Sequence, residues 1–297
     1  MIDGLWLALR AAGLVLALQA AGVGLFLSGC RAQLTPFAAV LRPHVRRVAA
    51  MALVTCLLQV GSEVTHMAGE WSGLTDPALL RLLTVSSAGI ALLVRLGAVA
   101  MLLAGLGRDT PAGRRLAVAG SVAVVGSFAL TGHTSTNAAR LLLAPLLVVH
   151  VAVAAFWFGA LWPLQRASAL APGVAAAQLA AAFSRAAIRL VPLLPLAGLG
   201  MALLLLPDLQ ALDSPYGRLL CLKVLLFALL MLLAGLNRLR FAPAMARGVA
   251  ASFVAFRRSV LLEWWLIVLT LAVTALLTGL YSPGHGAHHL AQLTAPA

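Results

Sequence analysis

Long uninterrupted runs of apolar residues, separated by short polar stretches, dominate the chain. A run of about 20 apolar residues is long enough to cross the hydrocarbon core of a bilayer as a helix. The runs lack the alternation of apolar and polar residues that marks the strands of a membrane barrel. The pattern therefore predicts an all-α, polytopic membrane helix bundle with eight transmembrane helices, at about residues 5–28, 47–69, 79–105, 115–133, 140–164, 183–206, 217–239 and 258–281.

Arginines are distributed unevenly between the two sets of loops that join these helices. Loops after the first, third, fifth and seventh helices hold most of them: Arg31, Arg42, Arg46, Arg47, Arg108, Arg114, Arg115, Arg166, Arg185, Arg238, Arg240, Arg247, Arg257 and Arg258. The opposite loops hold only Arg81, Arg140 and Arg218, together with four acidic residues. Since arginine-rich loops stay in the cytoplasm, we expect both termini to be periplasmic.

The composition excludes a soluble protein. Hydrophobic residues make up 62% of the chain and charged residues 10%, whereas soluble domains carry about 25% charged residues. The net charge of +13 does not indicate a nucleic acid partner, because the arginines follow the topology of the helices in membrane lipid. We expect one transmembrane domain over residues 1–281 and a His-containing periplasmic tail over residues 282–297.

The second predicted helix carries a polar face. Its members recur at steps of three and four residues, so they share one side of the helix: Cys56, Gln59, Glu63, His66 and Glu70. Such a face avoids lipid, so it lines the bundle interior or a wet cavity. Glu63, His66 and the neighbouring Met67 offer carboxylate, imidazole and thioether ligands for a metal cation. A polar network that only holds the helices together is the alternative.

Two further histidines lie in or beside apolar helices. His133 is expected at the outer end of the fourth helix, and His150 lies about ten residues below the outer end of the fifth. A single buried histidine is usually a core residue, but His66, His133 and His150 in one leaflet would suit copper or haem iron. The tail adds His285, His288 and His289, because a short His-rich tract can capture metal.

Other residues predict how the helices pack. Arg95 and Glu263 are expected to form an ion pair across the third and eighth helices. Pro192 and Pro195 should bend or loosen the sixth helix near its middle. Close helix approach is expected at the glycines of the first and fourth helices: Gly13, Gly22, Gly24, Gly120 and Gly126.

Several motifs in succession resemble the CopD family of bacterial copper-resistance membrane proteins. The first is GH at 132–133 with a polar linker, an apolar helix containing His150, and FWFGALWPL at 156–164. Then follow AAFSRAAIRLVPLLPLAGLG, YGRLLCLKVLLFALLMLLAGLNRLR, and a last helix containing RRSVLLEWW. The resemblance is strongest over residues 132–281, and the N-terminal half fits the eight-helix layout of the family more loosely.

The resemblance implies a multi-pass protein of the bacterial inner membrane that transports copper, from periplasm to cytoplasm, for copper homeostasis or resistance. From the residues described above, we expect its metal ligands to be His66, Met67, His133, His150, Glu63, His285, His288 and His289. The resemblance also implies a periplasmic CopC-like copper-binding protein as partner, expected as a separate polypeptide.

A b-type haem cytochrome is the alternative function. In that case, two of His66, His133 and His150 would hold haem b as axial ligands, and the protein would be a membrane oxidoreductase that transfers electrons, for example to copper.

The sequence contains no nucleotide-binding motif, so a transporter would be passive or coupled to an ion gradient. A helical scaffold for a copper-handling complex is a third interpretation.

Overall fold

A computed structural model describes residues 2–108, 110–131, 137–170, 173–206 and 210–281, and this part of the chain is helical without strands. The long helices are α1 (Ile2–Gly29), α3 (Ala38–Ala68), α5 (Ser87–Leu106), α6 (Pro111–Ser127), α8 (Arg140–Leu170), α9 (Val174–Leu190), α10 (Leu193–Leu205), α11 (Pro215–Leu236) and α13 (Ala250–Leu280). Short elements join them: α2 (Arg31–Leu34), η1 (Thr35–Phe37), η2 (Trp71–Thr75), α4 (Pro77–Val85), η3 (Phe128–Leu130), η4 (Gln210–Asp213), the π-helical η5 (Asn237–Phe241) and α12 (Ala242–Ala246).

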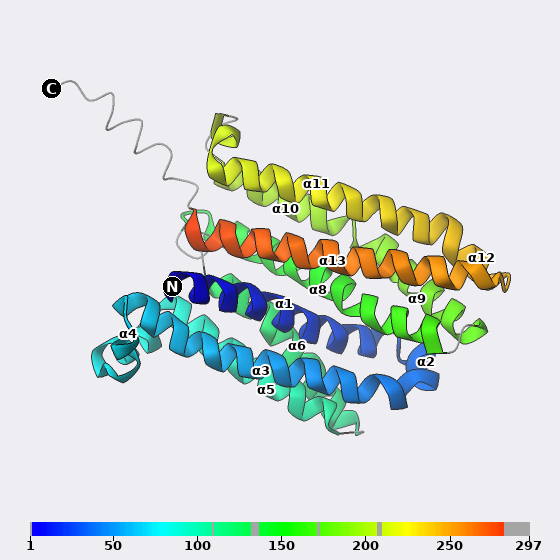
Figure 1. The fold of residues 1–297 in the computed structure, drawn as a ribbon, viewed down its shortest axis with the longest axis horizontal. Coiled ribbons are helices and arrows are strands. Elements are labelled where there is room, and N and C mark those ends of the chain that lie inside the picture. The colour runs from blue at the N-terminus through cyan, green and yellow to red at the C-terminus, as the bar shows by residue number, and fades with distance from the viewer. Residues whose placement is uncertain (1, 109, 132–136, 171–172, 207–209, 282–297) are drawn as a thin grey trace.

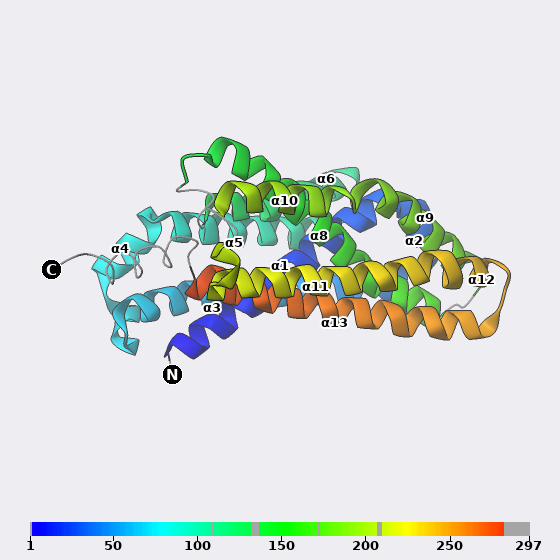
Figure 2. The ribbon, with the colours of Figure 1, turned by 90° about the horizontal axis from the view of Figure 1, so that it is seen from above.

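The predicted membrane bundle is confirmed. Eight helical segments in the described residues are long and apolar enough to span a bilayer, and the long helices lie side by side (Figures 1 and 2). The start of α1, the end of α13 and α4 lie at one end of the bundle, here called the α4 end; α2 and α12 lie at the opposite end, the α12 end (Figure 1). The protein is therefore an all-α, multi-pass membrane protein.

Several helices begin with the same local device, in which a Ser, Thr or Asp cap precedes a proline. Asp76 accepts a hydrogen bond from the Ala78 amide at 2.8 Å before α4. Thr110 and Ser214 accept from amides three residues on, before α6 and α11. Proline at the first helical position has no amide hydrogen to leave unpaired, so these starts follow directly from the local sequence.

Helix α1 is the central element of the bundle. It packs against α3, α8, α6 and α13, and in Figure 1 it lies between the α3–α5 and α8–α13 layers. A Cβ atom on Gly22 would lie 1.7 Å from the carbonyl oxygen of Ala155, so the backbones of α1 and α8 are in direct contact. Gly13, Gly24 and Gly120 are also closely packed, as predicted, but Gly126 has open space beside it, and that prediction was wrong.

Breaks divide two of the predicted helices. The sixth breaks at Val191 and Pro192, between α9 and α10, as its prolines predicted. The predicted helix at 79–105 was wrong at its start, because α4 ends at Val85 and a new helix begins after Ser86. The Ser86 hydroxyl accepts a hydrogen bond from the Gly89 amide at 3.0 Å and so caps the start of α5.

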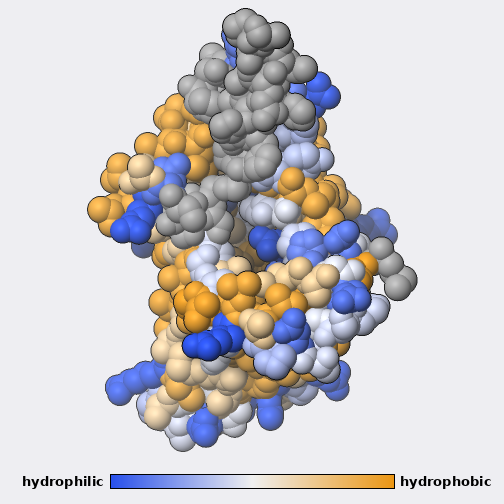
Figure 3. Space-filling model, turned by 90° about the vertical axis from the view of Figure 1, so that its left-hand side faces the viewer, coloured by the Kyte–Doolittle hydropathy of each residue, from blue (hydrophilic) through white to orange (hydrophobic). Residues whose placement is uncertain are grey.

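The helices are longer at the α12 end than the apolar runs predicted. Helix α3 begins at Ala38, α8 continues to Leu170, and α13 begins at Ala250. The added turns contain arginines and other polar residues, which helices tolerate well where they emerge from the lipid. At the opposite, α4 end, hydrophilic residues are scattered between patches of hydrophobic surface (Figure 3).

Candidate functional site

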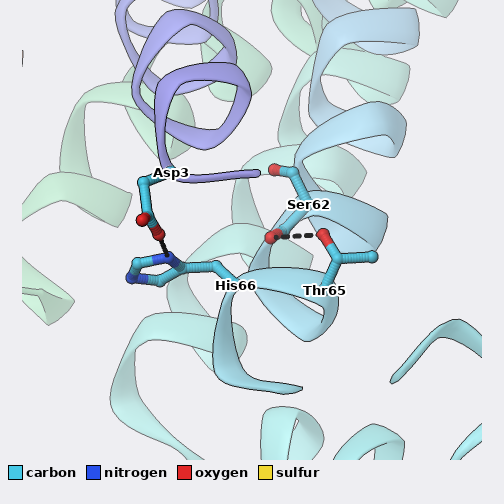
Figure 4. A network of polar contacts seen from close by, with 4 residues as sticks. All are labelled: Asp3, Ser62, Thr65 and His66. Atoms are coloured by element: carbon cyan, nitrogen blue, oxygen red, sulfur yellow. Dashed lines mark hydrogen bonds and ion pairs between the residues drawn. The ribbon is translucent and has the colours of Figure 1, made fainter. Parts of the chain in front are cut away.

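His66 lies in the last turn of α3, at the α4 end, and faces the start of α1. Its Nδ1 atom is 2.9 Å from Oδ1 of Asp3 (Figure 4). Its ring also stacks on Trp6, with ring centroids 4.2 Å apart and planes 10° apart. The side chain of His66 is 36% exposed and that of Asp3 is 83% exposed. The ring therefore has two fixed contacts and remains open to water.

These contacts determine which ring nitrogen is available to a ligand. An ionised carboxylate only accepts hydrogen bonds, so Nδ1–H of His66 donates to Asp3. The lone pair of the neutral ring then lies on Nε2. Histidines that bind metals usually donate their other ring N–H to a carboxylate or a backbone carbonyl in this way. Asp3 therefore fixes the orientation of the His66 ring and leaves Nε2 as the nitrogen with a free lone pair.

The rest of the polar face of α3 runs inward along α1. Cys56 and Gln59 are buried, Glu63 and His66 are half-buried, and Glu70 is exposed. The Gln59 side chain occupies the space over Gly13, where a Cβ atom would lie 2.4 Å from its Oε1. The structure thus places this face toward a neighbouring helix, except at its outermost residue.

Arginines offset the charge of Glu63. Arg10 of α1 and Arg95 of α5 both interact electrostatically with Glu63. Arg10 also lies 5.4 Å from the ring centroid of Trp6, and its Nη2 donates to the Thr278 hydroxyl at 3.4 Å. A copper ion moving inward along this seam would meet two guanidinium groups. This arrangement favours a structural role for Glu63.

Met67 follows His66 directly in the chain, and successive side chains leave an α-helix about 100° apart. Met67 is 41% exposed. Its thioether is available at the α4 end but does not share the helix face of His66. Met67 therefore lies near His66 in the chain but is not part of the contact between α1 and α3.

His150 contacts a different pair of helices. On α8, its Nδ1 donates to the backbone carbonyl of Leu194 at 3.0 Å, at the start of α10. Its ring packs beside Gly198, where a Cβ atom would lie 3.4 Å from Cε1. As in His66, the bond to Nδ1 leaves the lone pair on Nε2. Lys223 of α11 is close enough to repel positive charge at this ring.

The structure does not bring these two histidines together, because His66 faces α1 and His150 faces α10. Within the described ranges, no group of three or more His, Cys, Asp or Glu side chains could hold a metal ion. The other four histidines predicted as ligands lie outside the described residues: His133, His285, His288 and His289.

Sequence reasoning missed Asp3 and Trp6 as partners of His66. The signal was present in the spacing of Asp3, Trp6, Arg10 and Gly13, which lie on one face of α1. Helices α1 and α3 run antiparallel, so this face meets the polar face of α3 residue by residue. Pairing the polar positions of α1 with those of α3 in antiparallel order would have predicted the contact between Asp3 and His66.

The predicted ion pair between Arg95 and Glu263 was wrong. Nε of Arg95 donates to the Ser127 hydroxyl at 3.0 Å, and its guanidinium lies 3.9 Å from the ring centroid of Phe128. Glu263 instead accepts hydrogen bonds from Trp157 of α8, at 2.9 Å, and from Asn237 of η5. The two charges face different neighbours, because α5 packs on α6 whereas α13 packs on α8 and α11.

Comparison with protein-family models gives two matches. Residues 1–142 match the family described as "Copper resistance protein D-like, N-terminal domain", and residues 177–277 match "Copper resistance protein D". Together the two matches cover most of the chain, in the order expected for one protein. The chain belongs to the CopD family. No curated protein and no solved structure matched it.

Each of the two family matches contains one of the polar clusters. The contact between Asp3 and His66 falls within the N-terminal match, and Glu263 with Asn237 falls within the other. This CopD family protein thus has a copper-related function in a membrane, with one polar site at its α4 end and a second polar cluster deep in the bundle.

Proposed function

We propose that this protein transports copper across the bacterial inner membrane, from the periplasm to the cytoplasm. The observation that carries the proposal is the contact between Asp3 and His66. It leaves Nε2 of an oriented, partly exposed imidazole at the α4 end of a CopD family bundle. Imidazole binds both oxidation states of copper in proteins. His66 is the proposed ligand at this end of the described bundle.

The distribution of arginine supports a periplasmic position for His66. Arginine-rich loops join the helices at the α12 end, and such loops are retained in the cytoplasm. The α4 end is then periplasmic, together with both termini. A periplasmic CopC-like copper-binding protein is the proposed donor, and the exposed Asp3 and Met67 lie where it would dock.

His150 is the proposed ligand deeper in the bilayer. Its free Nε2 suits copper, but the neighbouring Lys223 opposes positive charge. Because the repulsion scales with the charge of the ion, Cu(I) is favoured over Cu(II) at this depth. His133 and the tail residues His285, His288 and His289 remain proposed ligands at the periplasmic face.

Among the described residues, no contact favours the haem alternative. Haem b with two axial histidines needs two rings that face the same iron from opposite sides. His66 is fixed against α1 and His150 against α10, so these two histidines supply no such pair. His133 lies outside the described residues.

The test replaces His66 and His150 singly with alanine and measures cellular copper at equal expression. His44 provides a matched control, because it lies in α3 as well but stacks on Trp162 of α8, with ring centroids 3.5 Å apart. We expect lower copper accumulation with His66→Ala and with His150→Ala, and unchanged accumulation with His44→Ala. Unchanged accumulation in both test variants would refute the proposed path.

A further inference from the structure

A groove of about 480 Å³ lies between α3 and α5 at the α12 end of the bundle. Helix α3 begins at this end and α5 finishes there, so the groove is remote from His66 at the α4 end. Two arginines and five small or aliphatic residues line it: Arg46, Leu53, Ala100, Leu103, Ala104, Gly107 and Arg108. Its lining therefore contains both cationic and apolar side chains.

The floor of the groove is formed by small residues on one face of α5. Ala100 and Ala104 are four residues apart and Gly107 follows three residues later, so all three lie on the same side. Leu53 lies seven residues further along α3 than Arg46, about 10 Å deeper in the bundle at 1.5 Å per residue. The groove thus has arginine at its outer end and an apolar surface toward the middle of the bundle.

Both arginines have hydrogen-bond donors to spare. Nη1 of Arg108 donates to the backbone carbonyl of Ala104, another lining residue, at 3.0 Å, which holds this guanidinium beside the floor. Arg46 is exposed, and its guanidinium has no hydrogen bond or ion pair with any residue that the structure describes. The arginine-rich loops contain a single acidic residue, Asp109, which lies outside the described residues. A guanidinium has five N–H donors, so this end of the groove favours an anion.

The combination of charge and apolar floor selects the kind of ligand. Guanidinium groups match the geometry of phosphate oxygens, and basic pockets between membrane helices bind acidic headgroups. A zwitterionic phospholipid also carries an ammonium group, which the two arginines repel. A soluble phosphate compound would leave the apolar floor uncovered. The matching ligand therefore has a phosphate, a net negative charge and an acyl chain.

We propose that this groove binds an anionic phospholipid of the surrounding membrane. Its phosphate accepts hydrogen bonds from Arg46 and Arg108, and one acyl chain lies along Ala100 and Ala104 between α3 and α5. The lipid thereby occupies the space between two helices of the N-terminal family match. Binding here does not depend on copper, because His66 is at the opposite end of α3.

The experiment measures lipid binding to the purified full-length protein in a nonionic detergent by native mass spectrometry. Dioleoyl phosphatidylglycerol and dioleoyl phosphatidylethanolamine have the same acyl chains and the same phosphate but differ in net charge. We expect about tenfold tighter binding of phosphatidylglycerol. Equal binding of the two lipids would overturn the proposal without any variant having to fold. Displacement of phosphatidylglycerol by glycerol 3-phosphate at equal concentration would also overturn it, because the phosphate alone would then suffice.

Charge variants locate the headgroup. Arg46→Gln and Arg108→Gln should each weaken phosphatidylglycerol binding about fivefold, the contribution of one arginine near a membrane surface. Arg47→Gln is the matched control, because Arg47 is the next residue in α3, exposed and outside the groove lining. We expect wild-type binding in this control. If Arg47→Gln weakens binding as much as Arg46→Gln does, only the general charge of this end attracts the lipid and the proposal is wrong.

A variant without any change of charge locates the acyl chain. Ala104→Phe fills the floor of the groove, and Ala104 is exposed, so the larger side chain does not disturb the core. Leu93→Phe is the control, because Leu93 is also in α5, 42% exposed and outside the lining. We expect about tenfold weaker phosphatidylglycerol binding in Ala104→Phe and wild-type binding in the control. Wild-type binding by folded Ala104→Phe would refute the proposed site.

Discussion

Replacing Asp3 with alanine should weaken copper binding at His66 without removing a ligand. In the structure Asp3 contributes one contact, the 2.9 Å bond that holds Nδ1 of the ring and directs Nε2 outward. The stacking of the ring on Trp6 remains in the variant. The imidazole is therefore retained near its present position, but its tautomer and orientation are no longer determined by a carboxylate.

The exposure of the pair sets the size of the effect. Loss of such a positioning partner typically lowers metal affinity by about 10- to 100-fold. Asp3 is 83% exposed, so water replaces part of the lost interaction. The loss of metal affinity should therefore be near the lower limit of this range. We expect about tenfold weaker binding, equivalent to about 1.4 kcal/mol. In Asp3→Asn, a neutral amide oxygen can still accept the hydrogen bond from Nδ1 of His66, and this bond is about half as strong as that to a carboxylate. We expect copper binding to weaken about threefold.

Dissociation constants are measured by competition between the purified protein and a chromophoric Cu(I) chelator in the absence of oxygen. His66→Ala provides the value for loss of the ligand itself. Asp213→Ala is the control for surface charge, because Asp213 is an exposed carboxylate in η4. The expected order of affinity is wild type and Asp213→Ala, then Asp3→Asn, then Asp3→Ala, then His66→Ala.

Two results would refute the reasoning. If Asp3→Ala binds copper as the wild type does while His66→Ala does not, the carboxylate has no positioning role. If Asp213→Ala weakens binding as much as Asp3→Ala, the effect comes from the general charge of the α4 end and not from the hydrogen bond to His66.

Three further predictions concern packing and topology. Gly22→Ala should sharply reduce the yield of folded protein, because its Cβ would lie 1.7 Å from a carbonyl oxygen of α8, whereas Gly126→Ala should be neutral; fluorescence-detected gel filtration distinguishes them. Glu263→Leu leaves two buried donors unpaired and should lower the unfolding free energy by about 2–6 kcal/mol, and Glu263→Gln by less, as measured by thermal unfolding in detergent. In a background without native cysteines, an impermeant thiol reagent added to spheroplasts should label Asp213→Cys but not Arg114→Cys; the reverse would overturn the orientation.

The length of the apolar runs was sufficient to predict the membrane bundle. Each of the eight predicted spans corresponds to a helical segment long enough to cross a bilayer. The break at Pro192 was predictable because proline weakens a helix interior, although α8 continues through Pro145 and Pro163. The break at Ser86 was missed, because serine is tolerated within helices and caps one only when its hydroxyl turns to a free amide.

The site was predictable only in part. The spacing of His66, Glu63 and Gln59 placed them on one face, and the structure confirms that this face turns toward another helix. The partner helix was not predictable from spacing, so Asp3 was overlooked. The wrong pairing of Arg95 with Glu263 has the same origin: opposite charges suggest attraction, but only helix adjacency determines which charges meet.

The sequence by itself thus determined the class of the protein, the number of its spans and the faces that avoid lipid, because hydrophobic length and helical periodicity are properties of neighbouring residues. Only the tertiary structure decided that Asp3 holds His66, that His150 contacts Leu194, and that Asn237 donates to Glu263. These contacts depend on which helices lie side by side and how each is rotated, and packing between distant segments sets both.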